Sequence, residues 1–314
     1  MDLFDRKGIA PMLIGQEGEP FDSDEYLFEL KLDGERCLAY VDPDRGTELI
    51  NKRGMRMLLK VPELSEIHKQ VRERCILDGE LLVITDGKPD FPSIQKRSLM
   101  SNPLKIELEA RQHPACFTAF DILFYQDKET MKLPLMERKE LLEKAVQSES
   151  PRFAISRTIE KQGKAFFELA KQQELEGIVA KRLDSLYYPG KRTKDWNKIK
   201  YLQDDDFIVL GYIPKSGHMT SVVLGQYKEK RLVYKGHVTL GVGGLDFQKI
   251  KTMPVCDASP VSVPSGNENA VWIEPQLVCI VKFMTRTANG GMRQPVFKGL
   301  REDKRPEECI DTSK

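Results

Sequence analysis

No stretch of this 314-residue sequence is apolar over the roughly 20 residues that a membrane-spanning helix needs. Its first residues, Met1–Arg6, do not form the charged and then apolar pattern of a signal peptide. Cysteine is scarce, with six in the chain, and no two are spaced as a Cys-x-x-Cys pair. These absences predict a cytoplasmic protein with reduced thiols and no zinc site.

The chain also lacks a large excess of either charge, because it has 49 basic and 48 acidic residues and a net charge of +1. The composition therefore does not indicate nucleic-acid binding. It does not exclude it either, since a basic groove can exist on a neutral protein whose acidic residues lie elsewhere. What is present, 40% hydrophobic and 31% charged residues, is typical of a globular protein, and the length suits two domains.

The pattern of apolar residues changes after residue 203. Before it, apolar strands alternate with amphipathic helices, which are expected over 91–101, 104–112, 135–146 and 164–172. Beyond the acidic stretch Gln203–Asp206 the helical spacing nearly vanishes and short strands dominate, as in a small β-barrel. We therefore predict an α+β domain over 1–203 and an all-β barrel domain over 204–314, with the acidic stretch as the linker.

One lysine lies among charges in the stretch Glu29–Arg36, which joins two apolar segments. The Asp33-Gly34 pair in it predicts a hairpin turn. Because side chains alternate along a strand, Glu29, Lys31 and Asp33 are expected on one face. A shielded lysine between two carboxylates can be positioned as a nucleophile. Taken alone, however, Lys-x-Asp-Gly is equally typical of a solvated hairpin.

Further charged or aromatic motifs follow along the chain, each beside an apolar segment. In order they are Asn51-Lys52-Arg53-Gly54, Asp78-Gly79-Glu80, Ala119-Phe120-Asp121, Glu176-Gly177-Ile178-Val179-Ala180-Lys181, Trp196-Asn197-Lys198-Ile199-Lys200 and Arg301-Glu302-Asp303-Lys304. Glu80 is expected at the turn of a buried hairpin over 75–84, where a carboxylate needs a cation or a hydroxyl as partner. Phe120 is either a core residue of a strand over 117–124 or a stacking platform for a base.

Taken together and in this order, the motifs resemble those of the ATP-dependent DNA ligases of the nucleotidyltransferase superfamily. The resemblance is strongest to the ligase modules of bacterial non-homologous end joining, and it covers nearly the whole chain. It implies an adenylation (nucleotidyltransferase) domain followed by an OB-fold domain that clamps DNA. It also implies ATP and Mg²⁺ or Mn²⁺ as cofactors and a monomer near the nucleoid. The implied partner is nicked double-stranded DNA, and the resemblance leaves open whether the chain works with a Ku-like end-binding protein, a primase-polymerase or a phage replication system.

The resemblance assigns roles to individual residues. Lys31 would attack the α-phosphate of ATP to form lysyl-AMP, and Lys198 and Lys200 would assist it by like-charge repulsion and by holding the phosphates. Glu176 and Asp33 would hold the metal ion. The remaining nucleotide contacts would be Glu29 on the adenine amine, Phe120 stacked on adenine, Glu80 on the ribose hydroxyls, and Arg36, Arg53, Arg192, Arg301 and Lys304 on phosphates.

One departure from the family pattern is Gln294, which stands where a histidine is expected before Pro295. Two other functions fit the same motifs. An RNA ligase or an mRNA-capping guanylyltransferase uses the same kind of lysine nucleophile, although Glu29 and the motif over 196–200 favour ATP and DNA. A nucleic-acid-binding clamp with an inactive catalytic domain would require a broken motif, and the sequence shows none.

Overall fold

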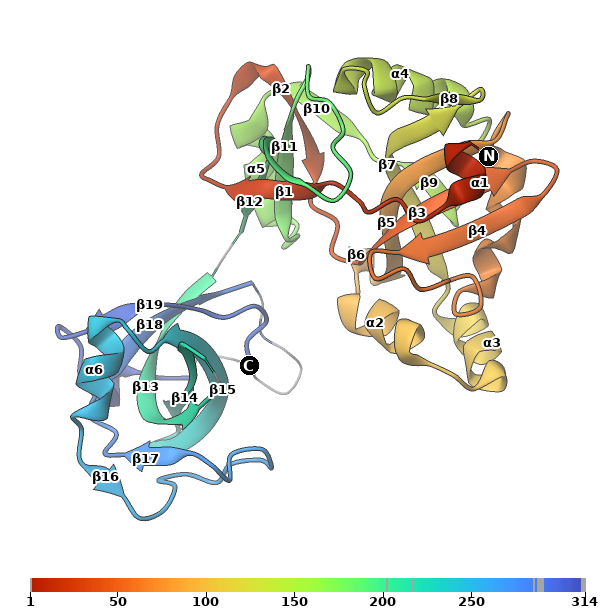
Figure 1. Cartoon of the computed structure of the whole chain (residues 1–314). Coiled ribbons are helices and arrows are strands. Elements are labelled where there is room, and N and C mark those ends of the chain that lie inside the picture. Colours follow the sequence, from red (N-terminus) through yellow and green to blue (C-terminus); the bar gives the residue numbers. More distant parts are fainter. Residues whose placement is uncertain (1, 202, 216, 285, 287–290, 312–314) are drawn as a thin grey trace. The chain divides into compact units, whose positions relative to one another are not determined.

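The computed structural model describes residues 2–201, 203–215, 217–284, 286 and 291–311. It divides into two compact units, Met1–Tyr201 and Leu202–Lys314, which we call unit 1 and unit 2 (Figure 1). Unit 1 contains two β-sheets with helices packed on them, and unit 2 is built around a single sheet. Within the described residues, no helix has the length and apolar character required to cross a membrane.

The first sheet of unit 1 has the strand order β1-β12-β11-β2-β10. Its strands are β1 (Leu13–Glu17), β2 (Ser23–Leu30), β10 (Thr158–Lys161), β11 (Gly177–Arg182) and β12 (Arg192–Lys200). The helix α5 (Gly163–Gln172) packs on it through Phe167 and Ala170, which join Phe28 and Ile178 in one apolar cluster. This helix was expected over 164–172, so its prediction is confirmed.

The second sheet of unit 1 has the order β4-β3-β5-β7-β8, with β6 and β9 at its margins. Its strands are β3 (Glu35–Asp42), β4 (Gly46–Asn51), β5 (Cys75–Thr85), β6 (Lys88–Pro89), β7 (Ala115–Tyr125), β8 (Lys128–Glu129) and β9 (Phe153–Ile155). The helices around it are α1 (Leu3–Arg6), the 3₁₀ helix η1 (Pro62–Gln70), α2 (Phe91–Leu99), α3 (Pro103–Gln112) and α4 (Leu135–Ala145). The predicted helices thus exist within a few residues of their expected bounds.

The two faces of the second sheet pack against different partners. One face meets η1 and α4, and Leu64 and Leu142 from these helices join a large cluster with Leu77 and Phe117. The opposite face carries Tyr40 and Phe120, which cluster with Trp196 of β12 in the first sheet. Apolar packing between the sheets therefore includes Phe120, which the sequence assigned to stacking on adenine.

The predicted hairpin around Asp33-Gly34 is wrong, because β2 and β3 belong to different sheets. The chain leaves the first sheet after Leu30 and enters the second at Glu35. Gly34 is packed so closely on β5 that a Cβ there would lie 2.2 Å from the carbonyl oxygen of Leu81. The glycine is needed for this close approach. Consequently Lys31 lies in a crossover between sheets, and Glu29 and Asp33 do not flank it on a strand.

The hairpin predicted over 75–84 is also wrong, since β5 is one continuous strand. Asp78-Gly79 is accommodated by a bulge in the pairing of β5 with β7. A Cβ at Gly79 would come within 2.4 Å of the carbonyl oxygen of Thr118, so this position also requires a glycine. The Asp-Gly pair is typical of a turn, but here the glycine allows β5 and β7 to approach each other closely.

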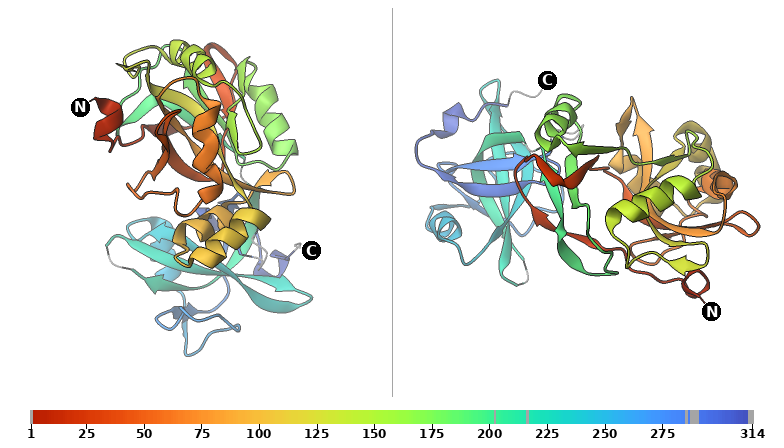
Figure 2. Two further views of the ribbon diagram at one scale, coloured as in Figure 1. Left: turned by 90° about the vertical axis from the view of Figure 1, so that its right-hand side faces the viewer. Right: turned by 90° about the horizontal axis from the view of Figure 1, so that it is seen from above.

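Unit 2 contains a sheet that curls on itself, with the order β15-β14-β13-β17-β16 and with β18 pairing both β13 and β19 (Figures 1 and 2). Its elements are β13 (Gln203–Pro214), β14 (Met219–Lys228), β15 (Arg231–Gly241), α6 (Leu245–Lys251), β16 (Val255–Cys256), β17 (Val271–Ile273), β18 (Val278–Phe283), β19 (Val296–Arg301) and the 3₁₀ helix η2 (Pro306–Glu308). The short helix α6 was not expected.

The acidic stretch Gln203–Asp206 is not a linker, because it forms the first residues of β13 and pairs with β18. Asp206 is buried and accepts hydrogen bonds from two cations of unit 2, which explains how a run of acids is tolerated within a strand. Unit 2 thus begins with a strand in which Asp205 and Asp206 are already paired with cations.

Candidate active site

Lys31, the expected nucleophile, follows β2 in the crossover between the two sheets of unit 1. Its backbone N–H donates to the carbonyl oxygen of Gly177 at 2.9 Å, which fixes the crossover against β11. Its Nζ lies 2.8 Å from Oε1 of Glu176, the residue before β11. The Lys31 side chain is 20% exposed, whereas that of Glu176 is 2% exposed. A buried carboxylate therefore orients an amine that a ligand can still reach.

Lys198 and Lys200 lie on β12, which pairs with β11. The Nζ of Lys198 is 2.9 Å from Oε2 of Glu17 on the neighbouring strand β1. Burial, followed by repulsion from Lys198, lowers the pKa of Lys200, which also interacts with Glu176 and Lys31. The structure therefore brings together the three lysines that the sequence assigned to catalysis.

A cavity of about 210 Å³ opens beside Lys31. It is lined by Ile14, Glu29, Leu30, Lys31, Leu32, Arg36, Glu80, Phe120, Val179, Lys181 and Trp196. We call it the first cavity. Phe120 comes from the second sheet and Val179 from the first, so both sheets contribute an apolar wall. The expected contacts of adenine and ribose, Glu29, Glu80 and Phe120, therefore meet at one place.

Glu29, which was expected to contact the adenine amine, is buried between two lysines. It is 2% exposed, and its two oxygens bind different lysines. Oε2 accepts a hydrogen bond from Lys181 at 2.6 Å, and Oε1 accepts one from Lys139 of α4. Sequence reasoning gave neither lysine a role. The signal for Lys139 was its spacing, because it lies four residues after Leu135 and three before Leu142 on the buried face of α4.

Arg36 was expected to grip a phosphate, but its guanidinium binds Asp78 of β5 through two hydrogen bonds of 2.6 Å. The hydroxyl of Tyr187 donates to the same carboxylate at 2.6 Å and accepts the backbone N–H of Met12 at 2.9 Å. The guanidinium carbon also lies 4.4 Å from the ring centroid of Phe120. Arg36 is thus part of a buried network that supports the aromatic wall of the first cavity.

Glu80 lines both the first cavity and a second cavity of about 470 Å³. The second cavity also contains Asn51, Arg53 and Ser98, and Arg53 is exposed with its backbone N–H bound to Oδ1 of Asn51. Burial raises the pKa of Glu80 to about 8, although Arg36 and Lys31 act in the opposite direction. A carboxyl group that keeps its proton near neutral pH can donate as well as accept a hydrogen bond.

Residues 14–200 match the family model described as ATP dependent DNA ligase domain, and residues 215–304 match the one described as ATP dependent DNA ligase C terminal region. The chain belongs to the ATP-dependent DNA ligase family. The resemblance inferred from the motifs is therefore confirmed. So is the fold class, a nucleotidyltransferase domain followed by an OB-fold domain.

Individual ligases resemble this chain over most of its length. The multifunctional non-homologous end joining protein LigD of Pseudomonas aeruginosa is 30% identical over 94% of this chain and 36% of that protein. The SPbeta prophage-derived DNA ligase-like protein LigB of Bacillus subtilis is 28% identical over 93% of this chain and 99% of that protein. The solved mycobacterial DNA ligase D complexed with ATP and MES has a TM-score of 0.57 and 25% identity, covering 99% of both chains.

The chain spans 36% and 39% of the lengths of two of the LigD proteins that it matches, those of P. aeruginosa and Mycolicibacterium smegmatis. The activities that those longer proteins combine are therefore not transferred to this ligase by the match alone. The similarity supports the catalytic and OB-fold units, which are the parts that the chain covers.

Three cations expected on phosphates bind protein groups within their own units. Arg192 begins β12 and donates to the carbonyl oxygen of Ile14 at 2.8 Å. Arg301 and Lys304 belong to unit 2, where both bind the buried carboxylate of Asp206, at 3.1 and 2.5 Å. Within their own units these side chains therefore have protein partners.

The described part of the ligase contains no group of three or more His, Cys, Asp or Glu side chains able to hold a metal ion. One feature nevertheless fits a divalent cation, because Oε2 of Glu176 is buried without a hydrogen-bond partner in that part of the chain. Burial raises the pKa of Glu176, and the charge of Asp33 adds to the effect. Since Mg²⁺ takes one or two carboxylates and completes its shell with water and substrate phosphates, both acids have suitable donor chemistry.

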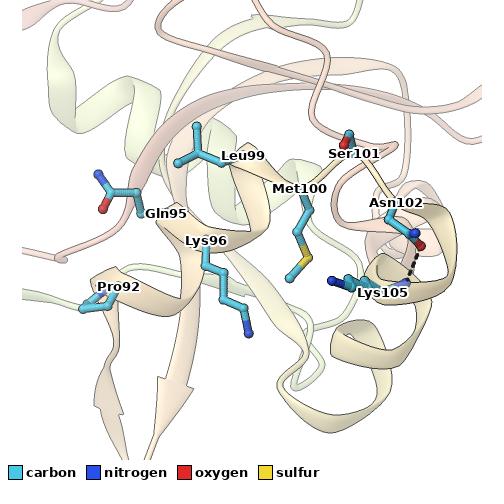
Figure 3. A pocket seen from close by; sticks show the side chains of 8 residues that line it. All are labelled: Pro92, Gln95, Lys96, Leu99, Met100, Ser101, Asn102 and Lys105. Carbon is cyan, nitrogen blue, oxygen red and sulfur yellow. Dashed lines mark hydrogen bonds between the residues drawn. The ribbon is translucent and has the colours of Figure 1, made fainter.

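A third cavity, of about 580 Å³, lies between α2 and α3 (Figure 3). Pro92, Gln95, Lys96, Leu99, Met100, Ser101, Asn102 and Lys105 line it, and none of them was assigned a catalytic role. Asn102 caps α3 by accepting the backbone N–H of Lys105 at 3.1 Å. Lys31 and Glu80 line the first cavity and Arg53 lines the second, so we take those two cavities as the candidate site.

The raised pKa of Glu80 predicts how stability changes with pH. The folded ligase keeps a proton on Glu80 up to about pH 8, whereas the unfolded chain loses it near pH 4.5. The folded state therefore loses stability as the pH rises through this window. Relative to the parent, Glu80→Gln should gain about 2 kcal/mol in the free energy of unfolding between pH 6 and pH 8.

Urea denaturation in a Trp272→Phe background would measure this change, because Trp196 is then the one tryptophan left and reports on unit 1. Glu140→Gln, an exposed position on α4, is the matched control and should show no such trend. Parallel stability curves for Glu80→Gln and its parent would contradict the assignment.

Proposed function

We propose that this chain is an ATP-dependent DNA ligase that seals nicks in duplex DNA through lysyl-AMP and adenylated-DNA intermediates. The observation that carries the proposal is the pair of Lys31 and Glu176 at the edge of the first cavity, with an amine 2.8 Å from a buried carboxylate. The family match supports this reaction class. The domain limits 1–203 and 204–314 are part of the proposal.

In the first step the Nζ of Lys31 forms a bond to the α-phosphorus of ATP, and the bond to the pyrophosphate group breaks. Glu176 orients the amine, and Lys198 and Lys200 supply positive charge where the phosphates would lie. Glu176 and Asp33 would hold Mg²⁺ or Mn²⁺, which offsets phosphate charge when bound. Arg36 and Arg192 support the site through their protein contacts, and Arg53 is available to a phosphate.

The nucleotide would occupy the first and second cavities. Phe120 and Val179 would form the apolar walls for adenine, and Glu29, which also lines the first cavity, would accept a hydrogen bond from the exocyclic amine. Glu80, which the two cavities share, would bond the ribose hydroxyls. ATP as the donor is supported by the mycobacterial relative, which was solved with ATP.

In the second step the 5′-phosphate of a nick takes AMP from Lys31, and the 3′-hydroxyl then displaces AMP and closes the strand. The LigD relatives are named for non-homologous end joining. We include in the proposal a role in repairing breaks, a Ku-like end-binding partner, and a monomer that works at the nucleoid. The substrate class is tested by measuring how well the chain seals nicked DNA and nicked RNA, each with ATP and with GTP.

Lys31→Ala should abolish formation of the covalent AMP adduct, a loss of more than about a thousandfold, because the change removes the amine that lies 2.8 Å from Glu176 at the first cavity. Transfer of label from [α-³²P]ATP to the denatured protein measures it. Lys69→Ala, which removes an exposed lysine paired with Glu66 on η1, is the control and should label like the parent. A labelled Lys31→Ala protein would show that the nucleophile lies elsewhere.

Glu176→Gln should raise the Mg²⁺ concentration needed for half-maximal adduct formation by about tenfold or more, since one anionic ligand is lost while the side-chain shape is kept. A titration of adduct formation against Mg²⁺ or Mn²⁺ provides the measurement. Glu174→Gln, two residues away and exposed beside Lys88, is the matched control. If the Glu176→Gln titration overlays that of the control, Glu176 does not hold the metal.

Arg301→Ala and Lys304→Ala should each reduce adduct formation from ATP by about tenfold or more, because we propose that both cations align the departing pyrophosphate. Sealing of a nick that already carries a 5′-adenylate should be preserved, since no pyrophosphate is present. Arg305→Ala, an exposed neighbour paired with Glu308, is the control for both assays. Equal losses on ATP and on adenylated nicks would rule out a role limited to the first step.

A further inference from the structure

Two consecutive cations of α4, Arg138 and Lys139, each bind a buried carboxylate beside the first cavity. Arg138 donates two hydrogen bonds to Asp121, from Nε at 2.7 Å and from Nη2 at 2.9 Å, and both side chains are fully buried. Asp121 directly follows Phe120 on β7. Arg138 therefore anchors the strand that carries the aromatic wall of the first cavity.

Lys139 makes the corresponding contact with Glu29, on the other sheet of unit 1. Its Nζ donates to Oε1 of Glu29, whose Oε2 is held by Lys181. Glu29 and Lys181 line the first cavity, but Lys139 does not, so it touches the cavity only through Glu29. Lys139 lies outside the motifs that the sequence analysis singled out.

The two lysines around Glu29 have different neighbours. Lys181 lies 4.3 Å from the ring centroids of both Phe120 and Trp196, so it is held by two aromatic faces and by the carboxylate. Lys139 approaches the same carboxylate from α4. Because the terminal torsion of a glutamate is soft, one ion pair alone would let the carboxylate rotate. Two cations on separate oxygens fix its plane, and each oxygen keeps a lone pair.

We propose that Lys139 is a positioning residue for nucleobase selection, which holds Glu29 in the orientation that accepts the exocyclic amine of adenine. The inference rests on the proposed function, in which Glu29 reads that amine. Inosine triphosphate carries a carbonyl oxygen in place of the amine. A fixed carboxylate oxygen repels it, whereas a carboxylate that can turn away does not.

Lys139→Met should therefore weaken the discrimination between ATP and inosine triphosphate more than it slows adduct formation from ATP. The methionine keeps the length and apolar stem, and Glu29 keeps Lys181 as its partner, so no buried charge is left unpaired. The inhibition constant of inosine triphosphate divided by the KM for ATP, both measured for adduct formation, should fall about tenfold. Lys139→Arg, which retains a cation, should restore much of the ratio.

Two further variants make the test decisive. Lys144→Met removes an exposed lysine of the same helix and should leave the ratio and KM unchanged. Glu29→Gln tests the contact between Glu29 and the amine separately from the role of Lys139. If it leaves the ratio unchanged, Glu29 does not read the amine and the proposed adenine contact fails. If it lowers the ratio while Lys139→Met does not, the proposed contact stands and the role of Lys139 is overturned.

A thermal melt accompanies each variant. A lower melting temperature for Lys139→Met with a parental ratio would show that Lys139 serves only to hold α4 on the sheet, and would refute the proposal. A lower ratio at a parental melting temperature supports it directly. If Lys139→Met does not fold, the same comparison is made with Lys139→Gln, and the ratio again decides.

Discussion

The arrangement of unit 1 depends on a close contact between Gly34 and β5, where a Cβ would meet the carbonyl oxygen of Leu81 at 2.2 Å. This contact lets the chain pass from one sheet to the other within a few residues, and Lys31 lies in that passage. A nucleophile on a regular strand would have its environment set by one sheet. In the crossover it is held by Gly177 and Glu176 of the first sheet while it faces a cavity that both sheets line.

Buried charges hold this site together, and each is compensated by a partner from a distant part of the sequence. Asp78 binds Arg36 and Tyr187, and Glu29 binds Lys139 and Lys181. Removing every partner of one of these carboxylates would leave an uncompensated charge in an apolar setting, which typically costs about 3–5 kcal/mol. The network therefore resists rearrangement. It gives the walls of the first cavity a fixed geometry before any ligand arrives.

Sequence reasoning found the elements that have strong periodicity and the residues that belong to ordered motifs. It failed where the same short sequence is compatible with two different backbone structures. Asp33-Gly34 and Asp78-Gly79 have the composition of turns, yet one is a crossover and the other lies within a strand, because close packing against another strand also demands glycine. It also missed Lys139, because its partner, Glu29, is set by the way α4 packs on the sheets. A short sequence motif contains no information on that packing.

The cluster around Asp206 has a consequence for binding strength. Asp206 and Asp303 face Arg301 and Lys304, so two negative and two positive side chains cancel within unit 2. An incoming phosphate does not meet unpaired cations. A phosphate that binds here would displace a carboxylate from its cation. The net free energy of binding would then be the difference between two similar ion pairs. If Arg301 and Lys304 act on the pyrophosphate as proposed, its capture by this segment would therefore be weak and quickly reversed, a property suited to groups that must release their ligand at every turnover.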